Sequence, residues 1–101
     1  MSAAYVIATA RIRPERREAF LAAAKACVEE TRREAGCLRY DMHESVSEPN
    51  CFVFVEEWTS KEAIDAHFER PHTIAFLRIA AVSVVAAPVI EIVTPAKVDR
   101  R

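Results

Sequence analysis

The fold is decided by residues 51–77, CFVFVEEWTSKEAIDAHFERPHTIAFL. The stretch opens with an apolar run of β-branched and aromatic residues, which predicts a buried strand over 52–58. Thr59 and Glu62 then stand three residues apart, the spacing of a capping box, and predict a helix that runs to about Arg70. A proline follows at once, and proline suits the first position of a second helix because its missing N–H has no helical partner there. The stretch therefore predicts a strand followed by two helical segments.

The rest of the chain completes an alternating order of strands and helices. Apolar runs predict three more strands, at Ala4–Arg13, Cys37–Ser45 and Ala87–Thr94. Apolar residues at helical spacing predict a helix over Glu15–Glu34, and the helix after the proline continues through Ile74, Leu77 and Ala81. The only glycine, Gly36, stands where a left-handed helix cap is wanted. The order strand, helix, strand, strand, helix, strand predicts an α+β, ferredoxin-like βαββαβ fold with a four-stranded antiparallel sheet.

Composition restricts the class of protein. The 101 residues predict a single domain over 1–101, with 51% hydrophobic residues and one glycine. The net charge is −1 and no basic patch stands out, so we expect no nucleic-acid partner. Three cysteines without a C-x-x-C pair fit free thiols in a reducing compartment. With no charged leader before an apolar run, and with 79–92 too short to cross a bilayer, we expect a cytoplasmic protein without a membrane partner.

The strands themselves predict self-association. Helices on one face of a sheet leave the other face to solvent, and that face is usually polar. The segments 5–8, 52–55 and 89–93 show little polar alternation, so both faces of the sheet require burial. We therefore expect a homodimer with two-fold symmetry that pairs one sheet with another.

Two histidines are candidates for catalysis. His67 falls on the apolar side of the helix that is predicted to end at about Arg70. His72 lies in the first turn of the helix that starts at Pro71. The positive end of that helix disfavours an imidazolium, so we expect His72 to be neutral at pH 7. A neutral imidazole can act as a base or donate a hydrogen bond to a developing oxyanion. The alternative is that His67 is a satisfied core residue and His72 a helix-start cap.

Three further residues are candidates for binding. Tyr40 and Trp58 lie on predicted strands beside the helices, and ordinary core packing is the alternative for both. Glu56 shares a strand face with aromatic residues, where a carboxylate must be paired or protonated. Glu56 is therefore either a functional acid or half of an ion pair with an arginine of a helix or of the dimer partner.

Metal and nucleotide sites are disfavoured. His43, His67 and His72 make a metal site conceivable, but His67 and His72 are five residues apart with a proline between them. No carboxylate–histidine motif completes a triad, so we expect no metal. Cys27 lies on the buried helix face without a neighbour that would activate its thiol. No glycine-rich phosphate loop is present, so we expect no nucleotide cofactor.

Four short segments carry a resemblance to a known family: Arg13-Pro14-Glu15, Glu34 to Tyr40, Glu56-Glu-Trp58, and His67 followed by Pro71-His72. Over nearly its whole length the chain resembles the antibiotic biosynthesis monooxygenase family of dimeric α+β barrel proteins, which includes small quinol monooxygenases. The resemblance implies a pocket between sheet and helices, and oxidation of a small phenolic or quinol-like molecule by dioxygen without a cofactor.

The resemblance also implies roles for particular residues. His67 or His72 would be the catalytic base or hydrogen-bond donor, and the substrate would be bound by Tyr40, Glu56, Trp58 and Phe76. A haem-degrading branch of the family uses an asparagine on the first strand, where this chain has Thr9, so haem degradation is disfavoured. Two alternatives stay open: an isomerase of the autoinducer-processing type, and a non-enzymatic ligand-binding dimer with structural histidines.

Overall fold

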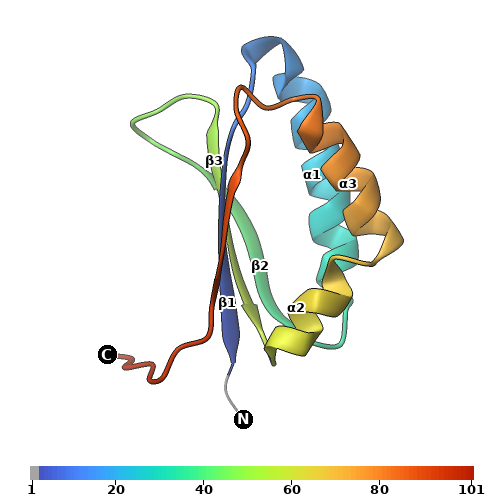
Figure 1. Ribbon diagram of the computed structural model, residues 1–101. Coiled ribbons are helices and arrows are strands. Elements are labelled where there is room, and N and C mark those ends of the chain that lie inside the picture. The colour runs from blue at the N-terminus through green and yellow to red at the C-terminus, as the bar shows by residue number, and fades with distance from the viewer. Residues whose placement is uncertain (1–2) are drawn as a thin grey trace.

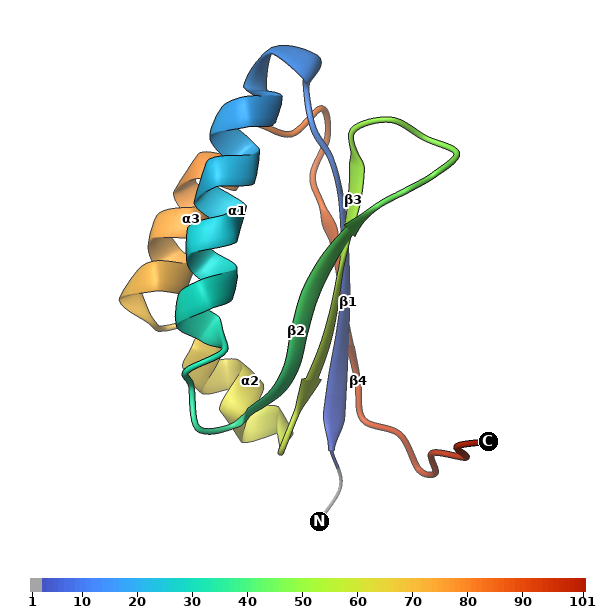
Figure 2. The same ribbon diagram turned by 180° about the vertical axis from the view of Figure 1, so that it is seen from behind.

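One antiparallel sheet carries all the helices on a single face. The computed structural model describes residues 3–101. The strands are β1 (Ala4–Arg11), β2 (Cys37–Glu44), β3 (Cys51–Trp58) and β4 (Val89–Val93), paired antiparallel in the order β2-β3-β1-β4. Figures 1 and 2 show α1 (Arg17–Thr31), α2 (Lys61–His67) and α3 (Pro71–Ala81) on one side of the sheet, with the short 3₁₀ turn η1 (Pro14–Arg16) before α1. The predicted ferredoxin-like α+β fold is confirmed.

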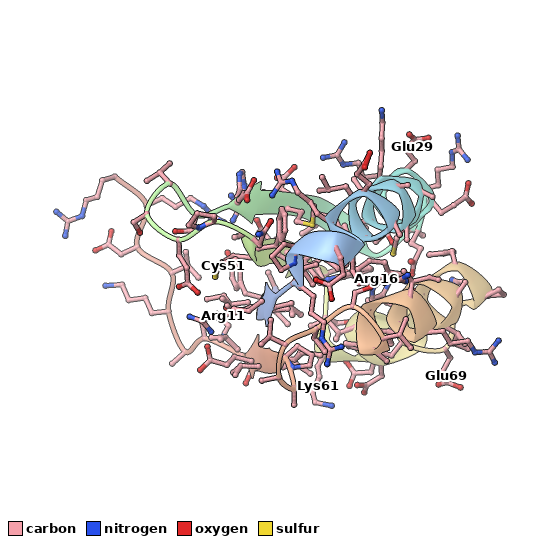
Figure 3. The ribbon with its side chains drawn as sticks, turned by 90° about the horizontal axis from the view of Figure 1, so that it is seen from above. Arg11, Arg16, Glu29, Cys51, Lys61 and Glu69 are labelled. Atoms are coloured by element: carbon pink, nitrogen blue, oxygen red, sulfur yellow. The ribbon has the colours of Figure 1, made fainter. Side chains whose placement is uncertain are left out.

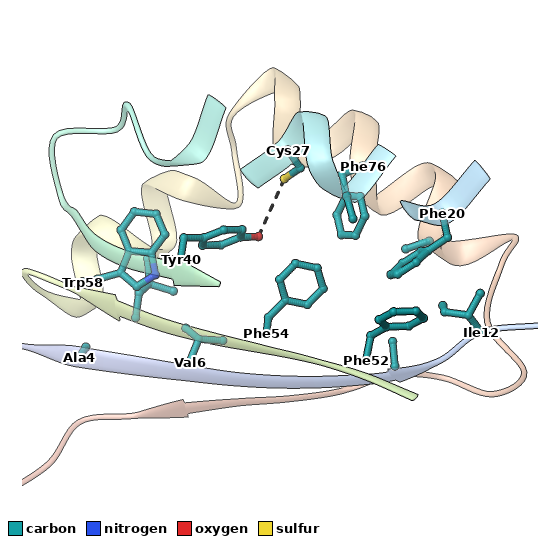
Figure 4. Close-up of a cluster of buried hydrophobic side chains, with 14 residues drawn as sticks. Ala4, Val6, Ile12, Phe20, Cys27, Tyr40, Phe52, Phe54, Trp58 and Phe76 are labelled. Atoms are coloured by element: carbon teal, nitrogen blue, oxygen red, sulfur yellow. Dashed lines mark hydrogen bonds between the residues drawn. The ribbon is translucent and has the colours of Figure 1, made fainter. Parts of the chain in front are cut away.

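The core lies between the sheet and the helices. Ala8 pairs with Phe54 on one side and with Ile90 on the other, so the even-numbered residues of the three strands share the helix-facing side. Aromatic rings fill this layer, and Phe20 of α1 packs on Phe52 and Phe76 with ring centroids 5.3 and 5.6 Å apart (Figure 4). Seen from above, charged side chains such as Glu29 lie at the outer rim (Figure 3). Among residues 3–101, no helix has the length and apolarity needed to span a bilayer.

The predicted end of the first helix was wrong. Helix α1 ends at Thr31 and not at Glu34, because residues 32–34 are all charged and the chain turns there. Helix α3 runs to Ala81 as predicted, and its buried residues are Thr73, Phe76 and Ala80. The apolar residues that gave the helical spacing, Ile74, Leu77 and Ala81, are exposed in the single chain.

The predicted role of Gly36 was also wrong. The φ angle of Gly36 is not positive, so Gly36 is not a left-handed cap. A Cβ added at Gly36 would lie 2.6 Å from Ala63 Cβ and 3.2 Å from Thr59 Oγ1. The position thus needs glycine because the chain passes closely over the start of α2.

The cap of α2 differs from the predicted one by a single residue. Ser60, not Thr59, is the N-cap, and its Oγ accepts a hydrogen bond from the Ala63 N–H at 3.1 Å. The last strand begins at Val89, after Pro88, because proline has no N–H for the ladder with β1.

In the single chain, apolar side chains are exposed on the sheet face without helices and on both faces of β4. Ile7 and Val93 are exposed on the face without helices, and Ile90 and Ile92 are exposed on the other. These residues supply the apolar surface on which the predicted homodimer rests, and the dimer itself stays a prediction.

Candidate functional site

A narrow apolar pocket lies between the sheet, α2 and α3. The space in it that the centre of a water molecule can occupy is about 60 Å³. Five polar residues belong to its lining, and these are Thr9, Tyr40, Glu56, His67 and Thr73. The exposed lining residues Leu77, Pro88 and Ile90 mark the side on which the pocket opens. The pocket therefore joins a few titratable groups to an otherwise apolar wall.

His67 is the last residue of α2 and supplies the imidazole of this pocket. Its side chain is 2% exposed, and its Nδ1 lies 2.8 Å from Glu34 Oε2 and 3.2 Å from Thr73 Oγ1. Because the carboxylate only accepts, Nδ1 carries the proton in the neutral ring and Nε2 is the nitrogen left for the pocket. Burial lowers the pKa of His67, and the hydrogen bond to Glu34 partly offsets this. His67 is therefore a neutral imidazole at pH 7, held in one tautomer.

Glu34 is the residue that the sequence analysis missed. It lies in the turn after α1, where its N–H bonds the Thr31 carbonyl and its own carbonyl accepts from Cys37 N–H. The turn sends a side chain that is only 7% exposed towards α2 and α3. The predicted helix through Glu34 hid this placement, although Glu34 belongs to one of the segments that carry the family resemblance. That membership was the only available signal.

His72 lies on the outer side of the same carboxylate. Its Nε2 is 2.7 Å from Glu34 Oε2, and its side chain is 21% exposed. The ring lines a separate surface hollow with Glu30, Arg33 and Arg70, and it is not among the residues that line the inner pocket. The structure thus brings both predicted histidines to one oxygen atom but gives only His67 access to the pocket.

Glu56 is a buried acid on the opposite wall. It accepts a hydrogen bond from Trp58 Nε1 at 2.9 Å, and no ion pair to it occurs among residues 3–101. Burial raises the pKa of Glu56 to about 7, against the opposing effect of the hydrogen bond from Trp58. A substantial protonated fraction therefore persists at neutral pH. Of the two readings of Glu56, this placement favours the functional acid.

The predicted aromatic residues divide into two groups. Tyr40 and Phe76 line the pocket, whereas Trp58 lies behind it, with its ring centroid 4.8 Å from that of His67. Burial raises the pKa of Tyr40, whose hydroxyl lies 3.9 Å from Cys27 Sγ (Figure 4). Burial also raises the pKa of the Cys27 thiol, so neither group ionises near neutrality. Tyr40 and Phe76 can contact a ligand, and Trp58 can only position groups that do.

The expectation that no carboxylate completes the histidine pair was wrong. Glu34, His67 and His72 each place a donor atom within 4.8 Å of the others, whereas His43 is exposed elsewhere on β2. This is the one set from which the described residues offer a cation three ligands. However, Glu34 Oε2 already accepts from both rings, and the Arg70 guanidinium lies 3.6 Å from Oε1. The cluster is complete as hydrogen-bonded groups, and the expectation of no metal stays a prediction.

Comparison with known proteins identifies the family. A family model described as antibiotic biosynthesis monooxygenase matches residues 3–78. The chain belongs to this family. Related sequences include "Putative monooxygenase YcnE" of Bacillus subtilis, which is 39% identical over 67 residues, 66% of this chain and 70% of that protein. Among solved structures, Rv0793 from Mycobacterium tuberculosis has a TM-score of 0.90 at 28% identity, over 98% of this chain and 100% of that one.

A third relative is matched over less than half of its own length. "Uncharacterized protein sll1783" of Synechocystis is 36% identical over 62 residues, which span 61% of this chain and 42% of that protein. The resemblance to the antibiotic biosynthesis monooxygenase family is confirmed, and it places the chain among monooxygenase-like proteins.

Proposed function

We propose that this protein is a cofactor-independent monooxygenase that oxidises a small phenolic or quinol-like substrate with dioxygen. One observation carries the proposal: a buried His67 is held through Nδ1 by Glu34 and lines an apolar pocket, so that Nε2 is the ring nitrogen left for a substrate. Such an imidazole is a base, and an electron-rich aromatic anion can itself reduce dioxygen.

The reaction balances without a further reductant. His67 removes a proton from the substrate, and the resulting anion gives one electron to dioxygen. Recombination of the substrate radical with superoxide forms a C–O bond, and protonation yields a hydroperoxide. Loss of the remaining C–H proton and cleavage of the O–O bond leave a carbonyl and release water. The substrate thus loses two hydrogens and gains one oxygen atom, and the second oxygen atom of dioxygen becomes water.

Each pocket residue has a part in this scheme. His67 is the catalytic base, and Glu34 fixes its tautomer and stabilises the imidazolium that forms. Protonated Glu56 donates a hydrogen bond to the developing peroxide, as its raised pKa allows. Tyr40 and Phe76 contact the aromatic ring, while the apolar wall excludes water.

The pocket also gives the homodimer a functional reason. Its space of about 60 Å³ is small, and its open side is formed by exposed residues of α3 and β4. A second subunit laid on β4 would close that side and enlarge the apolar enclosure around a substrate ring. We therefore include a homodimer in the proposed function.

Oxygen uptake tests the proposal. Metal-free protein is mixed with hydroquinones, dihydroxynaphthalenes and anthrones, and uptake is compared with that of His67→Gln and of the control His43→Gln. His43 is exposed and outside the pocket, so its variant should keep wild-type activity. Loss of the base should lower the rate by about 10²–10⁴-fold. Full activity in His67→Gln would overturn the assignment, and turnover under argon would instead favour the isomerase, which needs the same acid and base.

A further inference from the structure

We propose that Glu34 joins His67 and His72 into one acid–base unit that carries a single imidazolium, so that a proton taken from the substrate by His67 is matched by a proton released to solvent by His72. The inference rests on the proposed function for its substrate, but the coupling of the two rings is a property of the resting protein. It gives the histidines different tasks and adds Glu34 and His72 as residues that act through His67.

The geometry permits this exchange without breaking a contact. Both rings bond the same atom, Glu34 Oε2, at 2.8 Å from His67 Nδ1 and 2.7 Å from His72 Nε2. Each of these nitrogens carries a proton whether its ring is neutral or charged. Only the far nitrogens change, Nε2 of His67, which lines the inner pocket, and Nδ1 of His72, which lines the outer hollow. The charge can therefore move from one ring to the other while both hydrogen bonds persist.

Charge balance explains why one imidazolium is preferred over two. Glu34 is nearly buried and needs one positive partner, but a second charge in the same cluster would be buried without compensation. The ring centroids are 6.2 Å apart, so the charged rings repel each other. We assign the resting charge to His72, because its side chain is 21% exposed and that of His67 only 2%. The helix position, which led us to expect a neutral His72, takes no account of the contact with Glu34.

The other groups around the two rings leave this balance in place. Arg70 approaches Glu34 Oε1 at 3.6 Å, but its side chain is more than half exposed and solvent screens it. Glu30 and Arg33 on the rim of the outer hollow form an ion pair with each other, at 2.7 Å. On the inner side, burial raises the pKa of Glu56 to about 7. Cys37 is a neutral thiol, since burial raises its pKa to about 11.

The exchange has a defined proton count. The substrate O–H bond breaks, its electron pair stays on the phenolate oxygen, and the proton binds Nε2 of His67. The Nδ1–H bond of His72 breaks in turn, and its proton goes to water in the outer hollow. The cluster keeps its net charge, the substrate becomes an anion in the inner pocket, and one proton appears in bulk solvent. His67 thereby gains a positive charge beside the anion that it has produced.

The first arm of the test needs no substrate. The chain has only three histidines, so nitrogen NMR can follow every imidazole through a pH titration. In His72→Gln, loss of the competing charge should raise the titration midpoint of His67 by about one to two pH units, while exposed His43 stays constant. His72→Asn serves if the glutamine variant does not fold. An unchanged His67 midpoint would overturn the coupling.

The second arm follows proton release under argon. Wild type is mixed with a dihydroxynaphthalene while absorbance reports the phenolate and an indicator dye reports bulk protons. We expect about one proton per phenolate in the wild type and a several-fold lower ratio in His72→Gln, where the proton stays on His67. An equal ratio in both proteins would overturn the inference while leaving the oxygenase proposal intact. If the wild type binds the compound without forming phenolate, the proposed function fails, and the NMR arm decides the coupling alone.

Discussion

Replacing Glu56 by glutamine should make the protein more stable at neutral and alkaline pH. Glutamine has nearly the same shape, and its amide oxygen can still accept from Trp58 Nε1, which lies 2.9 Å from Glu56 Oε1. What the variant loses is the charge that Glu56 acquires on ionisation inside an apolar layer, where the side chain is 5% exposed. The substitution therefore isolates the free-energy cost of that charge.

The pKa gives the size and the sign of the effect. Burial raises the pKa of Glu56 from an ordinary 4.5 to about 7, so the folded state holds this proton more tightly than the unfolded state. The resulting stability is fully present below pH 4.5 and is lost as pH rises through 7. A pKa difference of one corresponds to about 1.4 kcal/mol, so the loss approaches about 3 kcal/mol by pH 8 as an upper limit.

Urea denaturation of both proteins between pH 4.5 and pH 8, at one fixed protein concentration, measures the effect. The free energy of unfolding of Glu56→Gln minus that of the wild type should rise by about 2–3 kcal/mol over this range. Glu57→Gln is the matched control, because Glu57 is the next residue on β3, faces the other side of the sheet and pairs with Arg100. A difference for Glu56→Gln that does not vary with pH would refute the reasoning.

Three further predictions test the packing and the chemistry. Gly36→Ala should lower the free energy of unfolding by about 1–3 kcal/mol in urea denaturation, since its Cβ would collide with Ala63; a neutral substitution would contradict the close approach. Ser60→Ala should cost about 1 kcal/mol and Thr59→Ala less, and the opposite ranking would restore the capping box predicted from sequence. Treatment with a chelator should leave oxygen uptake unchanged, with metal content checked by mass spectrometry, and loss of uptake restored by an added divalent ion would replace the cofactor-free scheme with a metal site on the histidine cluster.

The fold could be predicted because its signals are local and agree with one another. Apolar runs and a proline at a helix start fixed the number, order and type of the elements, and their order restricts the topology. The errors occurred where contacts between distant residues decide the structure. Gly36 was assigned to a local cap because the sequence does not show Ala63 lying against it.

The candidate site was predicted in part for the same reason. His67 and Glu56 were recognisable as polar groups on apolar faces, and both reach the pocket. Glu34 was missed because nothing about a glutamate near the end of a helix reveals that the next turn will aim it at two imidazoles 33 and 38 residues away. The expectation for His72 was drawn from its helix position alone, because the sequence does not show that Glu34 Oε2 lies 2.7 Å from its Nε2.

The position of Trp58 gives the protein a built-in optical reporter. It is the only tryptophan in the chain, it is fully buried, and its ring lies 4.8 Å from that of His67. An imidazolium quenches indole fluorescence much more strongly than a neutral imidazole does. The emission intensity of the unlabelled protein should therefore fall whenever His67 gains a proton, so that the protonation state of the site can be followed in real time during a single turnover.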